Sequence, residues 1–392
     1  MDFLDFINPL PADLITADTS ANTELLGNVV QRYTEGAQVP DLEGVKMAII
    51  GVPEDRGSLR NRGCSLAPNE IRKKLYELAI GNSTPKLVDL GNVVNGNELK
   101  DTFAALSVVC ADLLKMNIVP IILGGSQDIT YAQYLSYSGL DKTVNIVSID
   151  AHFDLGNSSE KNITSDNYVG KIILHQPNFL FNFSNVGFQT HFVGQAAIQM
   201  MDRLYFEAFR LGEVRKNIEE VEPIVRDADI LSFDITAIRA ADALGNKNVT
   251  PNGLFGEEAC QICRYAGMSD KLTSVGFYET NPSVDDHGQT VQLVAQMVWY
   301  FIDGFNNRKN DDPLRDLTSY KKFTVSIKED QHELIFYKSK LSDRWWMEVP
   351  VSESQSRHQR HQMVPCSYSD YETACRDEMP ERWWLATQKF IA

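Results

Sequence analysis

Two carboxylates and an imidazole follow a single apolar run at alternate positions. Residues 144–149 lead directly into Asp150, His152 and Asp154, with one residue between each. These side chains reach a common point only if the backbone turns there, as it does where a strand ends. Carboxylate oxygens combined with one imidazole suit Mn²⁺, Fe²⁺ or Zn²⁺ rather than Ca²⁺. Taken alone, the triplet is equally compatible with a surface loop or a capping cluster.

Three further apolar runs, residues 118–123, 230–233 and 272–277, also end in polar residues. The side chains that follow them are Gln127 and Asp128, Asp234 and Thr236, and Glu279 and Asn281. Ligands of parallel sheets bind outside the carboxyl ends of the strands. We therefore expect these residues to converge, with the ends of 118–123, 144–149 and 230–233 adjacent. Glu279 supplies an acid that can bind a cationic substrate.

The elements that must position these residues alternate along the chain. Seven short apolar runs bounded by turn residues are typical of buried parallel strands. They are residues 45–50, 87–90, 118–123, 144–149, 190–193, 230–233 and 272–276. The segments between them repeat apolar residues every three or four positions, as helices do. They include residues 69–80, 101–115, 129–137, 212–226 and 257–267. This order predicts a three-layer αβα fold with a mostly parallel, doubly wound sheet.

The pattern changes after the polar run at residues 306–313, which we interpret as a linker. Residues 323–327, 333–337 and 345–349 then alternate like an antiparallel meander, and a helix follows from near Ser367. We therefore predict an α/β domain over residues 1–310 and a small α+β appendix over residues 311–392. Four of the five tryptophans lie in this appendix. Either an interface or the appendix's own small core accounts for them.

Composition and charge exclude several classes of protein. The 37 Lys and Arg and 53 Asp and Glu residues give a net charge of −16, which repels nucleic-acid backbones and anionic membranes. The apolar runs are shorter than the roughly 18 residues of a membrane helix. Six scattered cysteines argue against a secreted protein, so we expect a cytoplasmic one. Cys260 and Cys263 lack the context of a redox motif and are interpreted as an inert pair on a helix.

Over about residues 40–305 the sequence resembles the arginase, agmatinase and formiminoglutamase superfamily, the ureohydrolases. Residues 51–72 match the family's Gly-x-Pro, its glycine-rich loop and its Ala-Pro-x-x-Ile-Arg, and Arg60-Asn61 resembles the formiminoglutamase branch. Residues 150–154 match Asp-Ala-His-x-Asp in full, and residues 279–282 with Asp285 match Glu-x-Asn-Pro and its following acid. The resemblance implies an arginase-like fold and the hydrolysis of C–N bonds in linear amidines.

The resemblance also implies roles for individual residues. The implied Mn²⁺ ligands are Asp150, His152, Asp154 and Asp234. Glu279 and Asn281 would bind the substrate, and Glu279 and Asp154 would be the catalytic residues. The family's proton-shuttling His has no counterpart between Asp154 and Leu174. We interpret His175, just beyond, as structural and His191 as a packed core imidazole.

Two ligand positions depart from the family pattern. Gln127 replaces the His of Gly-Gly-Asp-His-Ser, and Thr236 replaces the second acid of Ser-x-Asp-x-Asp. Both replacements are neutral, so they weaken metal binding and the activation of bound water. We expect one or two Mn²⁺ ions, bound weakly or not at all. Asp128 is a candidate compensating ligand, although the family's loop path would point its side chain the other way.

Two functions stay open. The first is a metal-dependent hydrolase similar to formiminoglutamase, with weak or no activity on a small amidine or guanidine. The second is a pseudoenzyme whose scaffold now serves binding or assembly. The resemblance implies a homo-oligomer in either case. Nucleotide binding by Gly124-Gly125 is disfavoured because the sequence contains neither GxGxxG nor GxxxxGK[ST].

Overall fold

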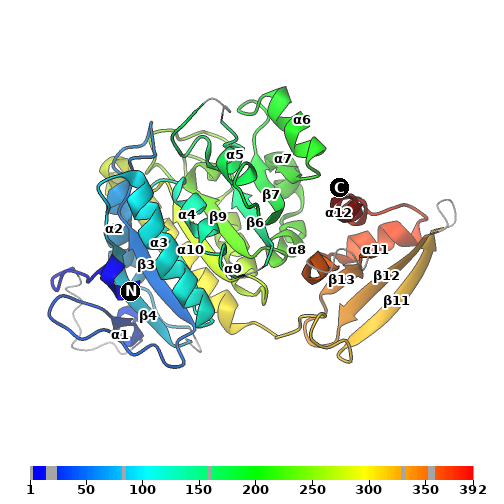
Figure 1. Cartoon of the computed structure of the whole chain (residues 1–392), viewed down its shortest axis with the longest axis horizontal. Coiled ribbons are helices and arrows are strands. Elements are labelled where there is room, and N and C mark those ends of the chain that lie inside the picture. Colours follow the sequence, from blue (N-terminus) through cyan, green and yellow to red (C-terminus); the bar gives the residue numbers. More distant parts are fainter. Residues whose placement is uncertain are drawn as a thin grey trace.

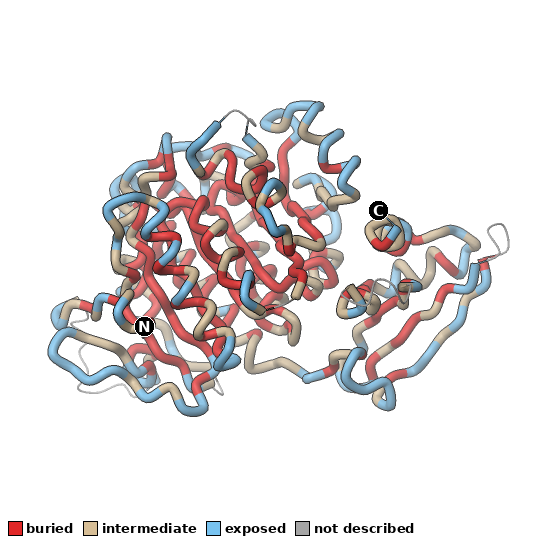
Figure 2. Tube along the Cα trace, in the orientation of Figure 1, coloured by how far each residue is buried: buried red, intermediate tan, exposed pale blue. Residues whose placement is uncertain are grey.

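Two sheets organise the chain (Figure 1). The computed structural model describes residues 3–14, 24–81, 85–140, 142–156, 160–327, 332–351 and 358–391. A ten-stranded sheet takes up most of this length, and a four-stranded antiparallel sheet follows it. Figure 2 shows that the central strands of the large sheet are the most buried part of the molecule.

The large sheet is parallel except at one edge. Its strands are β1 (Ile7–Asn8), β2 (Gln31–Arg32), β3 (Met47–Val52), β4 (Leu87–Val93), β5 (Val119–Gly124), β6 (Val144–Ile149), β7 (Leu180–Phe188), β8 (Glu207–Arg210), β9 (Ile230–Asp234) and β10 (Ser274–Tyr278). The order is β1-β4-β3-β5-β10-β9-β6-β7-β8, with β2 paired to β4 and β1 antiparallel. Every residue of β3, β5, β6, β9 and β10 is buried, as expected of parallel strands covered on both faces.

Helices cover both faces of this sheet, which confirms the predicted three-layer fold. They are α1 (Leu26–Val29), α2 (Ala67–Leu75), α3 (Leu99–Lys115), α4 (Ile129–Leu135), α5 (Tyr168–Ile173), α6 (Gln195–Arg203), α7 (Leu211–Lys216), α8 (Val221–Arg226), α9 (Gly256–Gly267) and α10 (Gln289–Asn306). One apolar core includes residues of α2, α9 and α10, and another includes residues of α3 and α4. Across the described residues, no helix is both long and apolar enough to cross a membrane.

Glycines allow α9 and α10 to pack closely. A Cβ on Gly267 would lie 2.2 Å from the carbonyl oxygen of Phe301, and one on Gly304 would lie 2.2 Å from that of Arg264. Both contacts are with backbone, so a larger residue would push the helices apart. This pair of helices braces the strands β9 and β10 that precede them.

Two of the predicted elements, one strand and one helix, are wrong. The run at residues 190–193 is a turn, and the strand in this region is β7, Leu180–Phe188. Buried Asn182 and Ser184 interrupt the apolar pattern of β7, and both bind the carboxylate of Glu207. The predicted helix at residues 212–226 is divided into α7 and α8, because Asn217 has a non-helical backbone (φ −148°, ψ 84°).

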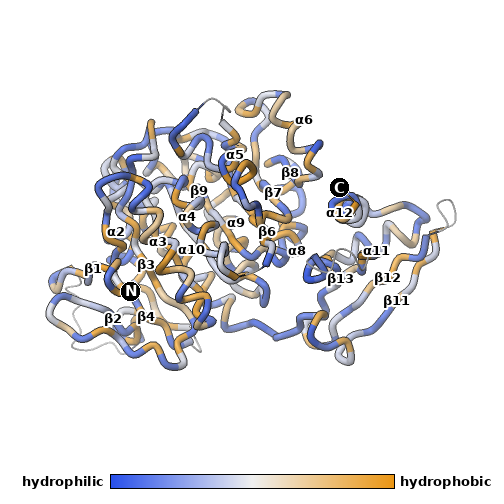
Figure 3. Tube along the Cα trace, in the orientation of Figure 1, coloured by the Kyte–Doolittle hydropathy of each residue, from blue (hydrophilic) through white to orange (hydrophobic). Residues whose placement is uncertain are grey.

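The second sheet forms the C-terminal region. Its strands are β11 (Tyr320–Ile327), β12 (His332–Ser339), β13 (Trp345–Glu348) and β14 (Met363–Cys366), in that order, with α11 (Tyr368–Cys375) and α12 (Glu381–Ile391) following. Trp345, Trp346 and Trp383 are buried in its apolar clusters, whereas Trp384 is 46% exposed. Most of the tryptophans therefore serve the region's own core. Figure 3 shows the polar connection that joins it to α10.

The C-terminal region contacts the large sheet near the amino ends of its strands. Arg360 donates two hydrogen bonds, of 2.6 and 2.9 Å, to the carboxylate of Asp229, which lies just before β9. His361 lies 3.0 Å from the hydroxyl of Thr143, just before β6, and stacks on Phe181. The predicted site lies at the opposite, carboxyl ends of these strands. The boundary between residues 310 and 311 stays a prediction.

Arg226 should be the residue that most firmly joins the two regions. Its guanidinium, 4% exposed, donates to the carbonyl oxygens of Trp345 and Cys366 and stacks on Trp346 at 4.2 Å. We expect Arg226→Ala to lower the free energy of unfolding by about 3 kcal/mol, because it leaves two buried carbonyl oxygens without their donor and leaves Glu222 with Arg344 alone. Denaturant unfolding and proteolysis within residues 307–319 would measure the effect.

Arg215→Ala is the matched control. Arg215 also stacks on an aromatic ring, that of Phe255 at 3.9 Å, but it pairs with Glu258 of the main region at the surface. Its loss should cost less than about 1 kcal/mol. Equal losses of stability in the two variants would show that Arg226 does not hold the C-terminal region in place.

Candidate metal centre

A pocket of about 480 Å³ lies at the carboxyl ends of the central strands. The predicted residues that line it are Gln127, His152, Asp154, Asp234, Thr236 and Glu279. They follow β5, β6, β9 and β10, which are neighbours in the order β5-β10-β9-β6. The expectation that β5, β6 and β9 end side by side is therefore wrong in one respect, because β10 lies between β5 and β9. Asp150 is 1% exposed beneath the pocket.

The strand register brings these side chains to one level. Ile149 pairs with Phe233, so Asp150 and Asp234 follow at equivalent positions. Asp234 in turn pairs with Tyr278, the residue before Glu279. Asp154 and Glu279 have positive φ, 48° and 64°, a backbone region that side chains other than Gly rarely adopt. The chain therefore turns sharply at two of the residues predicted to act in catalysis.

Three carboxylates crowd together in a buried place. Burial raises the pKa of Asp154 well above its usual range, and the neighbouring charge of Asp150 raises it further. Burial and then Asp150 raise the pKa of Asp234 in the same way. Asp150 accepts the backbone N–H of His152 and Asp234 that of Thr236, at 2.8 and 2.6 Å. These bonds fix the carboxylates without neutralising them.

His152 lies at the exposed side of the pocket. Its Nδ1 is 3.7 Å from Oδ1 of Asp150, too far for a hydrogen bond. Burial lowers the pKa of His152, but the adjacent carboxylate of Asp150 outweighs it and the net change is upward. The ring of Phe192 stacks on the imidazole, with centroids 4.9 Å apart and planes inclined by 22°.

Gln127 and Thr236, the two positions predicted to depart from the family's ligands, present buried oxygens. Among the described residues, Oε1 of Gln127 and Oγ1 of Thr236 have no hydrogen-bond partner, and neither does Oδ2 of Asp150. The Gln127 amide nitrogen lies 3.4 Å from the hydroxyls of both Ser148 and Ser232, which pair across β6 and β9. Buried polar atoms normally have a partner, so three unpartnered oxygens beside one pocket indicate a missing one.

Glu279 accepts hydrogen bonds from residues whose role as its donors the sequence did not predict. Its carboxylate accepts from the backbone N–H of Gln127 at 3.0 Å, from Asn61 at 2.8 Å and from Ser58 at 3.1 Å. Burial raises the pKa of Glu279 to about 7, against the lowering effect of these bonds. The loop at residues 55–62 was recognisable from its family motif, but its role in binding Glu279 depends on a contact over 218 residues.

Asn281 does not enter the pocket. It is fully buried, and its amide donates to Oδ1 of Asn61 at 2.9 Å and to the carbonyl of Arg62 at 3.0 Å. The predicted contact between Asn281 and substrate therefore has no support in this geometry. Its side chain instead holds Asn61 against Glu279.

Asp128 also stays outside the pocket. It is fully buried, and its carboxylate faces Gly57, where an added Cβ would lie 2.0 Å from Oδ2. The expected orientation, away from the ligand position, is confirmed. Burial raises the pKa of Asp128 to about 7.

His175 and His191 have different surroundings. His175 accepts or donates a 3.0 Å hydrogen bond with the Tyr131 hydroxyl and packs edge-on against Tyr134 and Phe179, which confirms its structural role. His191 is exposed in the turn after β7, so its interpretation as a core residue is wrong. The error follows from the misplaced strand.

The donor chemistry of the pocket fits a hard divalent cation. As the side chains stand, no three His, Cys, Asp or Glu residues of the described ranges are arranged to hold one. The unpartnered oxygens of Asp150, Gln127 and Thr236 are nevertheless the atoms that such an ion would satisfy. Burial and the neighbouring carboxylate of Asp150 raise the pKa values of Asp154 and Asp234, and a bound cation would favour their ionised forms.

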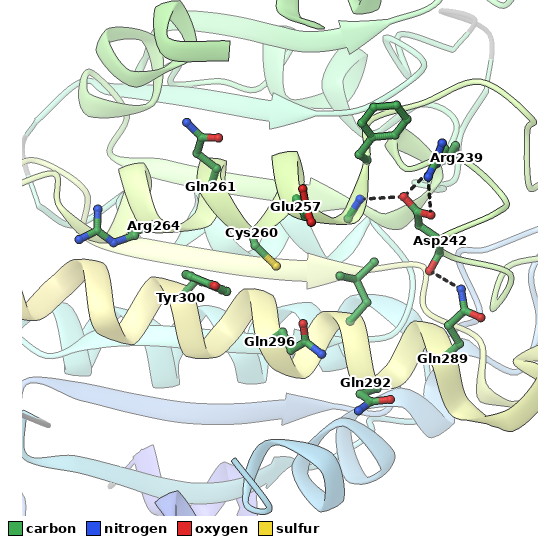
Figure 4. Close-up of a pocket in the computed structure, with 13 residues that line it drawn as sticks. Arg239, Asp242, Glu257, Cys260, Gln261, Arg264, Gln289, Gln292, Gln296 and Tyr300 are labelled. Atoms are coloured by element: carbon green, nitrogen blue, oxygen red, sulfur yellow. Dashed lines mark hydrogen bonds and ion pairs between the residues drawn. The ribbon is translucent and has the colours of Figure 1, made fainter. Parts of the chain in front are cut away.

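A larger pocket of about 690 Å³ lies elsewhere, between α9 and α10 (Figure 4). Its lining includes the ion pair of Arg239 and Asp242 and several glutamines of the two helices. It contains none of the predicted site residues. Cys260 lines it, but burial raises the pKa of this thiol to about 12 and also raises that of Cys263, which supports their inert role on α9.

Solved structures share this fold. Trypanosoma cruzi formiminoglutamase with Mn²⁺ superposes with a TM-score of 0.65 at 22% identity, over 72% of this chain and 99% of that one. Formimidoylglutamase from Bacillus subtilis superposes with a TM-score of 0.61 at 20% identity, over 70% and 96% of the two chains. At such identities the likeness is one of fold.

Sequence comparison adds the family. Formimidoylglutamase of Staphylococcus aureus strain JH9 is 28% identical over 268 residues, which cover 65% of this chain and 85% of that protein. The model of the arginase family matches residues 45–303, from just before β3 into α10. This match contains every strand end that lines the pocket, and the chain belongs to the arginase family.

Proposed function

We propose that this chain hydrolyses a C–N bond of a small linear amidine or guanidine, as formimidoylglutamase does, with a weakened Mn²⁺ site. The observation that carries the proposal is the convergence of Asp150, Asp154 and Asp234 with Glu279 at one pocket. The similarity to the Staphylococcus aureus enzyme supports the reaction class. The Mn²⁺ named for the Trypanosoma cruzi structure supports the choice of metal.

The proposed roles follow from position. Asp150, His152, Asp154 and Asp234 would hold the metal, with neutral oxygens from Gln127 and Thr236. A bound divalent ion would make water a nucleophile near neutral pH. Ionised Glu279, held by Asn61 and Ser58, would pair with the cationic nitrogen of the substrate. Asp154 would act in catalysis as an ionised ligand, helping to hold the ion that activates this water.

The weakness of the site is an argument from charge. The carboxylates of Asp150, Asp154 and Asp234 contribute three negative charges, whereas two divalent ions bring four positive ones. Gln127 and Thr236 add oxygen donors without charge. An ion held by too few anions dissociates readily and acidifies its water less.

A pseudoenzyme is the second candidate. It is favoured by the two neutral residues at ligand positions and by the C-terminal sheet, which docks at the opposite edge from the pocket. In that case the arginase-family scaffold would serve assembly, for example in a homo-oligomer, through a region that leaves the pocket untouched.

Turnover separates the two candidates. We expect the protein, exposed to excess Mn²⁺, to release formamide, ammonia or urea from formiminoglutamate, agmatine or arginine far below the 1–1,000 per second of ordinary enzymes. Elemental analysis and assays of formamide, ammonia and urea on the same sample would measure occupancy and rate. Asp234→Asn should abolish both. Two ions per chain with an ordinary rate would refute the weakened site, and bound metal without product would favour the pseudoenzyme.

Restoring the missing donors should restore the metal first. We expect Gln127→His with Thr236→Asp to raise Mn²⁺ occupancy, because it adds an imidazole and a carboxylate where buried oxygens have no partner. Calorimetric titration would measure this. The control is Gln38→His with Thr318→Asp, the same substitutions at exposed positions that do not line the pocket. Equal gains in the two double variants would point to non-specific binding by added surface groups.

A further inference from the structure

The orientation of His152 has an unusual basis. A histidine that binds metal almost always uses its other ring nitrogen to donate to a carboxylate, a carbonyl or water. Here the carboxylate of Asp150 lies 3.7 Å from Nδ1, and the described residues hold neither ring nitrogen of His152 in a hydrogen bond of normal length. The side chain is 40% exposed, so burial does not immobilise it either.

The close aromatic partner of this imidazole is Phe192. The two rings are stacked at 4.9 Å with an interplanar angle of 22°. Phe192 is 42% exposed. Both residues line the same pocket.

The backbone fixes the position of Phe192 relative to His152. The turn that carries Phe192 begins at Gln189, whose N–H donates to the carbonyl of Ala151, next to His152, at 3.0 Å. Phe192 donates its own N–H to Gln189 at 2.8 Å. From the other side, Asn185 of β7 donates to the carbonyl of His152 at 2.7 Å. The turn and the metal-binding loop therefore move as one unit.

We propose that Phe192 is a positioning residue, which orients the His152 imidazole for the metal by stacking on it. In other metal-binding histidines, a hydrogen bond from the second ring nitrogen has this role. The inference rests on the proposed metal-dependent function. The stack restricts rotation of the imidazole about both of its side-chain bonds. An imidazole that is already ordered loses less entropy when it becomes a ligand, so the metal binds more tightly.

Metal affinity tests the role of the stack. Phe192→Ala and Phe192→Leu should each raise the Mn²⁺ dissociation constant roughly three- to tenfold, the range expected for an aromatic pair. Phe192→Tyr, which keeps the ring, should bind as the unchanged protein does. Val249→Ala is the control, because Val249 is a similarly exposed apolar residue of the same pocket without a ring to stack. If the native affinity is too low for calorimetry, the same series is measured in the Gln127→His, Thr236→Asp background.

An NMR readout tests the stack without metal. The ring current of Phe192 should shift the His152 ring protons upfield in the unchanged protein and in Phe192→Tyr, and the shift should disappear in Phe192→Leu. A missing shift, or unchanged Mn²⁺ affinity in Phe192→Ala and Phe192→Leu, overturns the proposal. The shift could also be present although neither the unchanged protein nor the Gln127→His, Thr236→Asp variant binds Mn²⁺. In that case the stack exists, but the proposed function fails and the positioning role fails with it.

Discussion

The mutual repulsion of buried carboxylates is the constraint around which this structure is built. Asp150, Asp154 and Asp234 meet at the ends of neighbouring strands, where burial and proximity raise the pKa values of Asp154 and Asp234. Left to itself, such a cluster would spread apart or unfold the strand ends. Wholly buried strands with helices on both faces, including the closely packed α9 and α10, provide the rigidity that keeps it together.

The surroundings of the cluster are polar but contain few cationic groups. Hydroxyls and amides, those of Ser148, Ser232 and Gln127 among them, lie beneath it. Among the residues that line the pocket, Arg60 is the one Lys or Arg side chain, and it already pairs with Asp166 at 2.8 Å. The protein therefore supplies little positive charge of its own to the cluster. This arrangement leaves the balance of charge to a ligand, which is the physical link between the fold and the proposed chemistry.

Where the C-terminal region meets the large sheet, buried charges have partners within the chain. At the amino ends of the same strands, Asp229 meets Arg360, and this partner holds the pKa of the buried Asp229 carboxyl below its usual value although burial alone would raise it. Arg226 is likewise satisfied by carbonyl oxygens and by an indole ring. Asp229 and Arg226, where the two regions meet, are paired within the chain, whereas the described residues give Asp154 and Asp234 at the pocket no ion-pair partner. Because the two sets lie at opposite ends of the strands, the second sheet is accommodated without entering the pocket.

The sequence by itself determined the alternation of strand and helix, the residues at each strand end and the two neutral substitutions, because these depend on local periodicity and on motifs of a few residues. It did not determine that β10 lies between β5 and β9, since strand order arises from packing between distant segments. β7 was missed because its buried Asn182 and Ser184 are stabilised by Glu207, a partner that no local pattern reveals. The tertiary structure alone decided that Asn61 and Ser58 hold Glu279, that Asn281 donates a hydrogen bond to Asn61 and that Phe192 stacks on His152. Each is a contact between segments far apart in the chain, and a contact of that kind has no signature in either segment.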